Sequence, residues 1–444
     1  MCIRDRPQVD GERLGVYGHS MGGKLTVLTA TDKRVKAAVP SCGGISDRHN
    51  DSELFRKTVG DDPNLKQISC PIAFLSPSND FHGRIGDLPR SSKEIASQDW
   101  RVACSPHLSH RDTGEFFATG LLWFDQHLKG KFELPKAPKT ELDLGGTGGT
   151  PVFHIYPDTG KTIRSVEVFY TQHGKPIETS SDRSNTKSRF WHYVKPKKES
   201  GDHWSASIQI VDTDKPVWVY ANVEYQHSES VVGAGYYYEH YDTDKFVLSS
   251  LLKTVSSKAL KEAGVKATLK PTRLVEDFQG DWKKQWYQNN RDHWKIETHK
   301  IYDQTFAAPD SDGVKLAFGV QSANENTLLV LLDGKIATVD IKGDADWQEI
   351  KLAPADFKDF DGESLSNFKG ISTIGFSDTE RQRGKKSSER RSVGKNWKGN
   401  PPKFRQLRWI VGAAKTDQSK KQGCLLYTSP SPRDATLSRM PSSA

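Results

Sequence analysis

The stretch RLGVYGHSMGGKL, residues 13–25, joins an apolar run to the pattern G-x-S-x-G at residues 18–22. In this pattern a strand turns sharply into a helix, and the turn exposes the hydroxyl of its serine, which here is Ser20. We expect a strand over LGVYGH and a helix from Met21 to about Thr31. Gly22 and Gly23 follow where helix and strand are expected to approach closely. The stretch therefore predicts a strand–turn–helix unit that presents a serine.

The two ends of the chain share one short DNA element. MCIRD at the start and CLLYTSPSPRD from Cys424 can be encoded on opposite strands of the same DNA, as a translated sequencing adapter would be. We therefore interpret residues 1–6 and 424–444 as adapter scars. The native piece, over about 7–423, is then expected to be truncated at both ends. Truncation would explain why so few residues precede Ser20 in a motif that normally follows several strands.

Composition limits the classes of protein that the chain can represent. The 444 residues hold 64 Lys+Arg and 56 Asp+Glu, a net charge of +8, and without the two end segments the balance is 60 against 54, or +6. This charge is mild for the length and does not argue for nucleic acid. No run of about eighteen apolar residues is present, so we expect no membrane span.

Cysteine usage favours free thiols over a disulfide framework. Of five cysteines, three remain outside the end segments: Cys42, Cys70 and Cys104. Each lies in or beside an apolar run, which is typical of a buried thiol. Their spacing is too scattered for a zinc site. We therefore expect neither disulfides nor a bound metal.

Short apolar runs organise residues 7–133. LGVYGH, VKAAVPSC, CPIAFLSP and WRVACSP are separated by helical or loop segments, which is typical of parallel strands buried on both faces. GEFFATGLLWFDQHL, residues 114–128, predicts a helix. Its face toward the sheet would carry Phe117, Leu121, Phe124 and Leu128. A Gly- and Pro-rich stretch over 134–151 is interpreted as a linker.

Beyond the linker the apolar period changes to two. SVEVFYT, WSASIQIV and PVWVYANVEY predict an antiparallel β-sandwich over residues 152–265. VKLAFGV, NTLLVLLDG and FRQLRWIV predict a second sandwich, a jelly roll, over 270–415. The fold class predicted is α/β: a truncated parallel sheet followed by two mainly antiparallel β-sandwich domains.

An acid and a histidine follow Ser20 at the ends of later strands. PIAFLSPSND places Asp80 in the loop after its strand, with Asp87 as the alternative acid. WRVACSPHLSH offers His107 and His110. We favour His110, because the catalytic loop of such folds usually runs several residues past the strand. His19 and His82 are interpreted as neighbours of the site, outside the catalytic set.

These residue types together suit acyl transfer. A serine hydroxyl is a poor nucleophile until a base takes its proton, and a buried carboxylate fixes the tautomer of that base when it is histidine. The backbone N–H of Met21 would supply one oxyanion donor, and a loop earlier in the domain the second. We expect that loop to be missing, so the fragment itself is expected to be inactive. The alternative is that Ser20 is a structural turn residue in a protein without activity.

VDGERLGVYGHSMGG, PSNDFHG and SPHLSHRDTGEF resemble the dienelactone hydrolase / acetyl xylan esterase branch of the α/β-hydrolase superfamily, over about residues 7–130. The resemblance implies a Ser20–Asp80–His110 triad, ester hydrolysis and no cofactor. Enzymes that act on dienelactone carry a cysteine nucleophile where this chain has Ser20, which favours a carboxylic or carbohydrate (acetyl xylan-type) esterase. The branch shades into prolyl oligopeptidase-like hydrolases, so a serine peptidase is the alternative. An inactive polysaccharide-binding protein is the second alternative.

The third region resembles galactose-binding-like jelly-roll modules, through VEDFQGDWKKQWYQNN and DWQEIKLAPADF. Trp282, Trp286, Tyr287 and Trp397 are candidates for stacking on sugar rings, with ordinary core packing as the alternative. Such modules often accompany secreted polysaccharide-processing enzymes. The resemblance thus implies a polysaccharide or small ester as the partner, and a periplasmic or extracellular location.

A basic run covers residues 381–408, with eleven Lys or Arg and one acid. We expect a solvated loop, with contact to an anionic polysaccharide or to phosphates as the alternative. The chain carries no RRM, KH or zinc signature. We therefore expect neither nucleic acid nor membrane as a partner.

Overall fold

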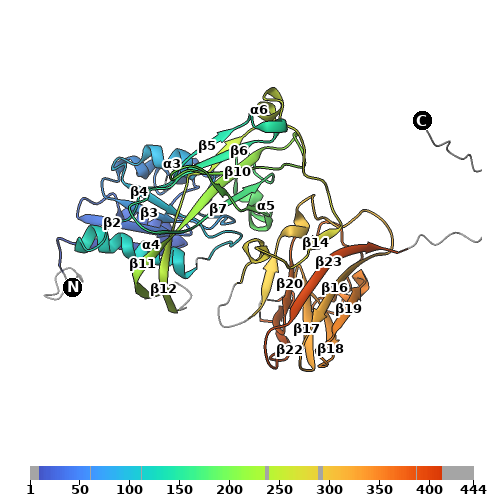
Figure 1. Cartoon of the computed structure of the whole chain (residues 1–444). Helices are drawn as coiled ribbons and strands as arrows, with labels where there is room; N and C mark the ends of the chain where they lie inside the picture. The colour runs from blue at the N-terminus through green and yellow to red at the C-terminus, as the bar shows by residue number, and fades with distance from the viewer. Residues whose placement is uncertain are drawn as a thin grey trace, which may run out of the picture.

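The computed structural model describes residues 10–60, 62–111, 113–235, 240–288, 294–386 and 388–412. Figure 1 shows a larger N-terminal body, coloured blue to green, and a C-terminal body of β-strands, coloured orange to red. Both segments interpreted as adapter scars lie outside the described residues. Among the described residues, no helix is long and apolar enough to cross a membrane.

Four parallel strands form the sheet nearest the N-terminus, in the spatial order β1-β2-β3-β4. Their bounds are Leu14–His19 for β1, Val35–Ser41 for β2, Ile72–Leu75 for β3 and Trp100–Ala103 for β4. Each strand falls within one of the four apolar runs, so these predictions are confirmed. Because the strands are parallel, the loops that follow them meet at one edge of the sheet.

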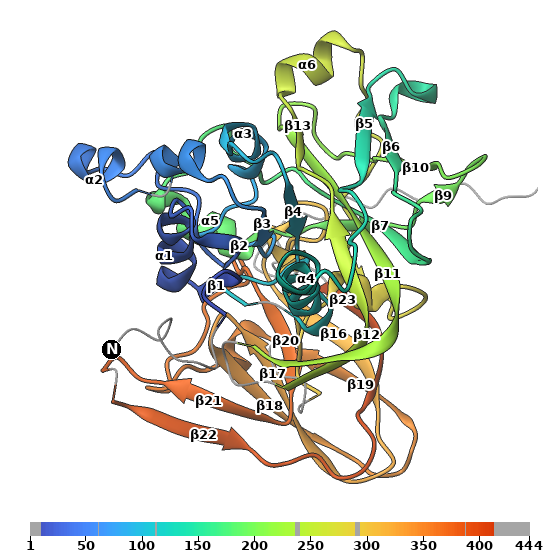
Figure 2. The ribbon, with the colours of Figure 1, turned by 90° about the vertical axis from the view of Figure 1, so that its left-hand side faces the viewer.

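Two helices pack against this sheet (Figure 2), α1 Met21–Thr29 and α4 Gly114–Phe124, which a π-helical turn extends over Asp125–Lys129. The helices α2 Glu53–Lys57 and α3 Leu88–Glu94 contact the 3-10 turn Asp62–Gln67. The predicted apolar face of α4 is largely wrong. Phe117 is buried, but Leu121 and Phe124 are only partly so, whereas Leu122 and Trp123 are 2% and 0% exposed. The reason is that α4 packs between the parallel sheet and β12 of the next region.

Two antiparallel sheets follow, in the orders β5-β6-β10-β9 and β12-β11-β7-β8, with β13 paired to β11. Their bounds are β5 Lys139–Asp143, β6 Val152–Tyr156, β7 Ile163–Thr171, β8 His192–Val194, β9 Lys197–Lys198, β10 Trp204–Ser207, β11 Val217–Ala234, β12 His240–Ser249 and β13 Lys253–Val255. Two short helices accompany them, α5 Arg183–Ser188 and α6 Ser257–Glu262. The predicted change to antiparallel strands is confirmed.

The second sheet of this region shares its core with the parallel sheet. In β11, Val217, Val219 and Ala221 are buried as the alternation predicts, but Trp218 and Tyr220 between them are buried as well. These two pack with residues of β2, β3 and β4 in one apolar cluster. In addition, β5 lies inside the stretch interpreted as a linker. Residues 10–133 and 139–265 are therefore joined by a continuous core.

The C-terminal region consists of two antiparallel sheets, β14-β23-β16-β19 and β15-β20-β17-β18, and the hairpin β21-β22. The bounds are β14 Leu274–Glu276, β15 Ile296–Thr298, β16 Val314–Gln321, β17 Asn326–Leu332, β18 Lys335–Ile341, β19 Trp347–Leu352, β20 Ile374–Ser377, β21 Thr379–Arg383, β22 Arg390–Gly394 and β23 Lys403–Val411. Both sheets contribute to one apolar cluster, separate from those of the N-terminal body.

The basic run does not form the solvated loop expected from its composition. It includes most of the hairpin β21-β22 and the first six of the nine residues of β23. Arg391, on β22, donates to Gln382 Oε1 on β21 and to the carbonyl of Asp359. Seven of the eleven bases therefore stand on strands, and Lys385, Lys386, Lys395 and Lys398 lie between them.

Candidate active site

Ser20 occupies the sharp turn between β1 and α1. Its φ is 61° and its ψ is −119°, a conformation that ordinary residues rarely adopt. Close backbone packing explains the turn: a Cβ on Gly18 would lie 2.3 Å from the carbonyl oxygen of Gly22, and one on Gly23 would lie 2.7 Å from that of Ser41. Strand and helix thus approach closely at Gly22, as expected, although a Cβ on Gly22 itself would meet no described atom within 4 Å.

The structure brings together the three residues predicted as a triad. Ser20 Oγ lies 2.6 Å from His110 Nε2, and His110 Nδ1 lies 3.0 Å from Asp80 Oδ1. With Nδ1 protonated, His110 donates to Asp80, and its Nε2 accepts the hydroxyl proton of Ser20. Ser20 follows β1, Asp80 follows β3 and His110 follows β4, so the parallel sheet positions all three.

Asp80 is fully buried, and its surroundings favour the charged form. Burial alone would raise the pKa of this carboxyl group, but the hydrogen bond and charge of His110 and the amide of His82 together hold the pKa below its usual value. The side chain of His110 is 22% exposed. A buried anion thus orients a histidine that remains accessible.

The alternatives for the acid and the base lie elsewhere. His107 is buried, with its Nε2 2.9 Å from the carbonyl oxygen of Lys284 in the C-terminal region. Burial lowers the pKa of His107 to about 3, so this ring is neutral near pH 7. Asp87 precedes α3 and lies 3.3 Å from Arg84. Neither residue is positioned to assist Ser20.

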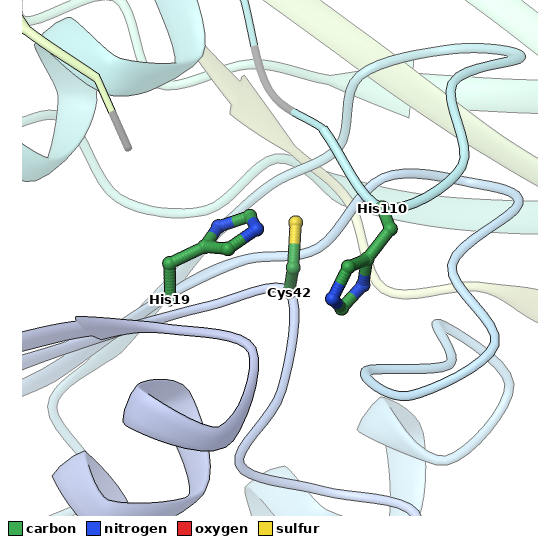
Figure 3. A group of neighbouring side chains, drawn as sticks. All are labelled: His19, Cys42 and His110. Atoms are coloured by element: carbon green, nitrogen blue, oxygen red, sulfur yellow. The ribbon is translucent and has the colours of Figure 1, made fainter. Parts of the chain in front are cut away.

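Three further side chains surround His110. His19 Nδ1 lies 3.1 Å from Ser41 Oγ, and burial, followed by the charge of His110, lowers the pKa of His19 to about 4. His82 Nδ1 lies 3.2 Å from the carbonyl oxygen of Cys42. Figure 3 shows the thiol of Cys42 between the rings of His19 and His110. Both histidines are neighbours of the site, as the sequence suggested.

The donor atoms of His19, Cys42 and His110 lie within 4.8 Å of one another, a spacing that a thiophilic cation can bridge. Nε2 of His110 is also the atom that faces Ser20 Oγ. A cation held there would compete with the serine hydroxyl for the base. The arrangement therefore suits proton transfer by His110, and metal binding would oppose it.

Met21 begins α1, directly after Ser20. Backbone N–H groups in the first turn of a helix have no partner within the helix and point out of its end. The amide of Met21 is therefore placed to stabilise negative charge that develops beside Ser20 Oγ. The Met21 side chain, 61% exposed, projects away from the core.

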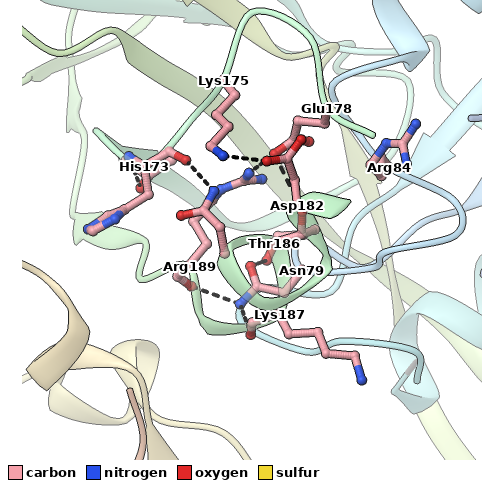
Figure 4. Close-up of polar contacts among 12 residues, drawn as sticks. Asn79, Arg84, His173, Lys175, Glu178, Asp182, Thr186, Lys187 and Arg189 are labelled. Atoms are coloured by element: carbon pink, nitrogen blue, oxygen red, sulfur yellow. Dashed lines mark hydrogen bonds and ion pairs between the residues drawn. The ribbon is translucent and has the colours of Figure 1, made fainter. Parts of the chain in front are cut away.

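Sequence reasoning missed a clamp on the loop that carries Asp80. Asn79 is fully buried, and its Nδ2 donates to the carbonyl oxygens of Lys187 and Arg189, at 3.1 and 2.8 Å (Figure 4). Its Oδ1 accepts from Trp191 Nε1 at 2.8 Å. These three hydrogen-bond partners lie more than a hundred residues away in the chain, so no local sequence pattern predicts the contacts. The segment around α5 thereby fixes the position of the acid.

The aromatic candidates of the C-terminal region fall into two groups. Trp282, Trp286 and Tyr287 line a cavity of about 600 Å³ together with Trp294, Trp347 and Phe404. Trp286 is also a core residue, and its Nε1 donates to Glu276 Oε2 at 2.9 Å. Trp397 is absent from the cavity lining; its ring packs against Trp294 and its Nε1 donates to the carbonyl of Asn400.

Comparison with known proteins agrees with the geometry of the N-terminal body. Residues 2–110 match the model of the dienelactone hydrolase family. Over these residues the chain is similar to that family. No curated protein matches the chain as a whole or in part at a significant level.

Several solved structures are similar to part of this chain. Acetyl xylan esterase 1 from Thermoanaerobacterium sp. JW/SL YS485 is 17% identical, with 28% of this chain and 48% of that chain covered and a TM-score of 0.23. A puromycin-hydrolyzing peptidase of Mycobacterium tuberculosis is 20% identical, with 27% and 22% covered and a TM-score of 0.24. An acylaminoacyl peptidase of Pyrococcus horikoshii is 19% identical, with 29% and 26% covered and a TM-score of 0.24. The chain spans less than half the length of each of these structures.

Proposed function

We propose that the protein is a serine hydrolase of carboxylic esters, with Ser20 as nucleophile, His110 as general base and acid, and Asp80 as the orienting carboxylate. The observation that carries the proposal is the continuous hydrogen-bonded line from Ser20 Oγ through His110 to Asp80, at 2.6 and 3.0 Å. The natural substrate we propose is a carbohydrate ester of the acetyl xylan type. The acyl-enzyme route needs no metal and no organic cofactor.

The reaction proceeds in two transfers. His110 Nε2 takes the proton of Ser20 as Oγ attacks the ester carbonyl, and the Met21 amide stabilises the oxyanion that forms. The protonated His110 then gives that proton to the leaving alcohol, which breaks the ester bond and leaves an acyl group on Ser20. Water attacks this acyl group while His110 accepts its proton, and the acid product leaves as Ser20 recovers its hydrogen.

We further propose that the C-terminal region is a jelly-roll module that holds the enzyme on polysaccharide. The cavity that Trp282 and Tyr287 line supports this proposal, because aromatic faces stack on sugar rings. Replacement of Trp282 by Ala should then weaken binding to insoluble xylan in a pull-down assay, whereas Trp204→Ala, on β10 of the middle region, should not. Export of the protein to the periplasm or the medium stays a prediction, as does the absence of nucleic acid and membrane partners.

The proposal is tested with a panel of substrates. 4-Nitrophenyl acetate, acetylated xylan and a prolyl-peptide anilide are offered to the wild type and to Ser20→Ala, both as this chain and as a longer gene product that contains it. We expect the longer product to turn over the esters, with kcat reduced at least about a thousandfold by the substitution, and this chain by itself to be inactive. The reason for this difference is that the second oxyanion donor would come from an earlier loop, which the longer product would supply.

Other outcomes would assign the protein differently. Turnover of the peptide alone would place it among the prolyl oligopeptidase-like peptidases. No turnover of any substrate, combined with binding to xylan, would identify an inactive polysaccharide-binding protein. Ester hydrolysis that survives the loss of Ser20 would exclude this residue as the nucleophile.

A further inference from the structure

Two cationic side chains of α5 lie beside the candidate active site. The guanidinium carbon of Arg183 is 3.8 Å from the centre of the Phe81 ring, and Nζ of Lys187 is 4.8 Å from it. The Phe81 ring in turn lies 4.8 Å from that of His110. Residues four apart share one face of a helix, so α5 turns both cations toward the same ring. One aromatic side chain thus links two positive charges to the proposed base.

The acidic residues near these cations are engaged elsewhere. Asp182 pairs with Lys175, and Glu178 pairs with Arg189 (Figure 4). Asp80 is buried and pairs with His110. Over the described ranges of the chain, neither Arg183 nor Lys187 forms an ion pair with a carboxylate. Among the described residues, the Asp80 carboxylate acts on Lys187 only at longer range, so neither cation is in contact with a carboxylate.

The two cations are held close together on a fixed backbone. Partial burial, and after it the charge of Arg183, lower the pKa of Lys187. Asn79 holds the carbonyl oxygens of Lys187 and Arg189, so α5 is tied to the loop that carries Asp80. Like charges on a fixed element repel one another, and an anion placed between them relieves that repulsion. Arg183 is exposed and Lys187 is half-buried, which leaves their donors accessible.

We propose that Arg183 and Lys187 bind a carboxylate of the substrate, so that the enzyme prefers esters that carry a negative charge close to the scissile bond. This inference rests on the proposed ester hydrolysis and narrows its substrate class to acidic esters, such as those of uronic or dicarboxylic acids. A guanidinium beside an ammonium offers several charge-assisted hydrogen bonds to one carboxylate. Phe81 would pack against the apolar part of the same molecule.

Two matched pairs of esters test the preference. 4-Nitrophenyl hydrogen glutarate and 4-nitrophenyl valerate differ by a charge on the acyl side. 4-Acetoxybenzoate and 4-acetoxybenzamide differ by a charge on the alcohol side. We expect the wild type to favour the charged member of at least one pair, and the pair tells which side of the ester meets the cations. The ratio of kcat/KM within that pair should fall at least about tenfold in the double variant Arg183→Gln, Lys187→Gln.

Controls separate recognition of charge from damage to the fold. Arg183→Lys with Lys187→Arg keeps both charges and should keep the preference. Lys258→Gln, on α6, removes an exposed lysine whose partner is Glu262 on the same helix and should change neither ratio. Higher salt should reduce the preference of the wild type, because solvent-exposed charges are screened. Equal rates within both pairs, or a ratio that the double variant leaves unchanged, would overturn the proposal.

Failure of the proposed hydrolysis gives a different result from failure of this inference. If neutral and charged esters are turned over alike and Ser20→Ala removes both activities, the hydrolase stands and the carboxylate site does not. If no ester is turned over, calorimetric titration with glutarate and with 4-hydroxybenzoate decides the question of binding. Heat of binding that the double variant abolishes supports the carboxylate site, and equal heats in both proteins contradict it.

Discussion

The N-terminal parallel sheet and the C-terminal pair of antiparallel sheets differ in where they place polar side chains. In the first, buried or half-buried polar groups gather in the loops after β1, β3 and β4, with Asp80 fully buried. In the second, both sheets contribute to one apolar cluster, and Trp282, Trp286 and Tyr287 line a cavity whose lining also includes the exposed Trp347. The first arrangement suits chemistry and the second suits attachment.

His110 and His107 lie in the same loop after β4 but have different predicted roles, one in catalysis and one in stability. His110→Ala removes the group that takes the Ser20 proton, so we expect kcat for 4-nitrophenyl acetate to fall about a thousandfold or more. His107→Ala removes a buried ring that contacts the C-terminal region through Lys284, so we expect lower stability. Steady-state kinetics and thermal unfolding of both variants separate these roles. A larger loss of kcat in His107→Ala would reverse the assignment.

The two candidate acids provide the next contrast. Asp80→Asn keeps the shape of the side chain but cannot hold the same tautomer of His110, so we expect a loss of about a hundredfold or more in kcat/KM. Asp87→Asn weakens a contact with Arg84 and should leave kcat/KM within about twofold. The same ester assay serves for both variants. Similar losses in the two would remove the reason for choosing Asp80.

Two phenylalanine substitutions test whether the C-terminal apolar cluster is independent of the core that contains the parallel sheet. Phe376 is fully buried in the C-terminal cluster, and Phe376→Ala should lower the free energy of unfolding of that region by about 3–5 kcal/mol while ester hydrolysis persists. Phe169 belongs to the core shared with the parallel sheet and its ring contacts His107. Phe169→Ala should lower both stability and hydrolysis. Urea unfolding followed by activity measurements tests the difference; loss of activity in both variants would show that the regions act as one unit.

Acid should weaken both regions through buried neutral histidines. Burial lowers the pKa of His107 to about 3 and that of His299, near β15, to about 4, from an ordinary 6.5. Below pH 6.5 these histidines are protonated in the unfolded chain but stay neutral in the folded protein. The free energy of unfolding therefore falls as the pH drops toward the folded-state pKa values. Each ring should contribute about 1.6 kcal/mol of this loss between pH 6.5 and 5.

Gln at either position removes the titrating group. His107→Gln and His299→Gln should each flatten the dependence of unfolding free energy on pH, measured by urea denaturation at pH 7, 6 and 5. His49, in an exposed turn between β2 and α2, is the matched control and should leave the slope unchanged as His49→Gln. A slope that all three variants share with the wild type would mean that other groups govern acid sensitivity.

Much of the active-site geometry follows from local sequence. Ser20, Asp80 and His110 each stand just beyond an apolar run, and parallel strands bring their carboxyl ends to one edge whatever lies between them. The turn at Ser20 adds a second local signal, because Gly18 and Gly23 allow the strand and helix to touch. These positions could be predicted because each depends on a few neighbouring residues and one rule of sheet topology.

What the sequence did not predict depends on contacts between distant segments. The clamp of Asn79 on residues 187–191 joins two loops that no pattern relates. The shared core was missed because β11 was interpreted as a strand with one buried face. Trp218 and Tyr220 are large apolar residues on the opposite face, and the unbroken apolar run over 217–221 was a signal of burial on both sides.

The most direct test of the central claim is to trap the acyl group and find its position. The protein is incubated briefly with 4-nitrophenyl acetate, quenched in acid, digested with trypsin and analysed by mass spectrometry. The account predicts an acetyl adduct on the peptide Leu14–Lys24, at Ser20. This adduct should be absent in Ser20→Ala. Turnover of the ester with the acetyl group on another residue, or undiminished turnover in Ser20→Ala, would contradict it.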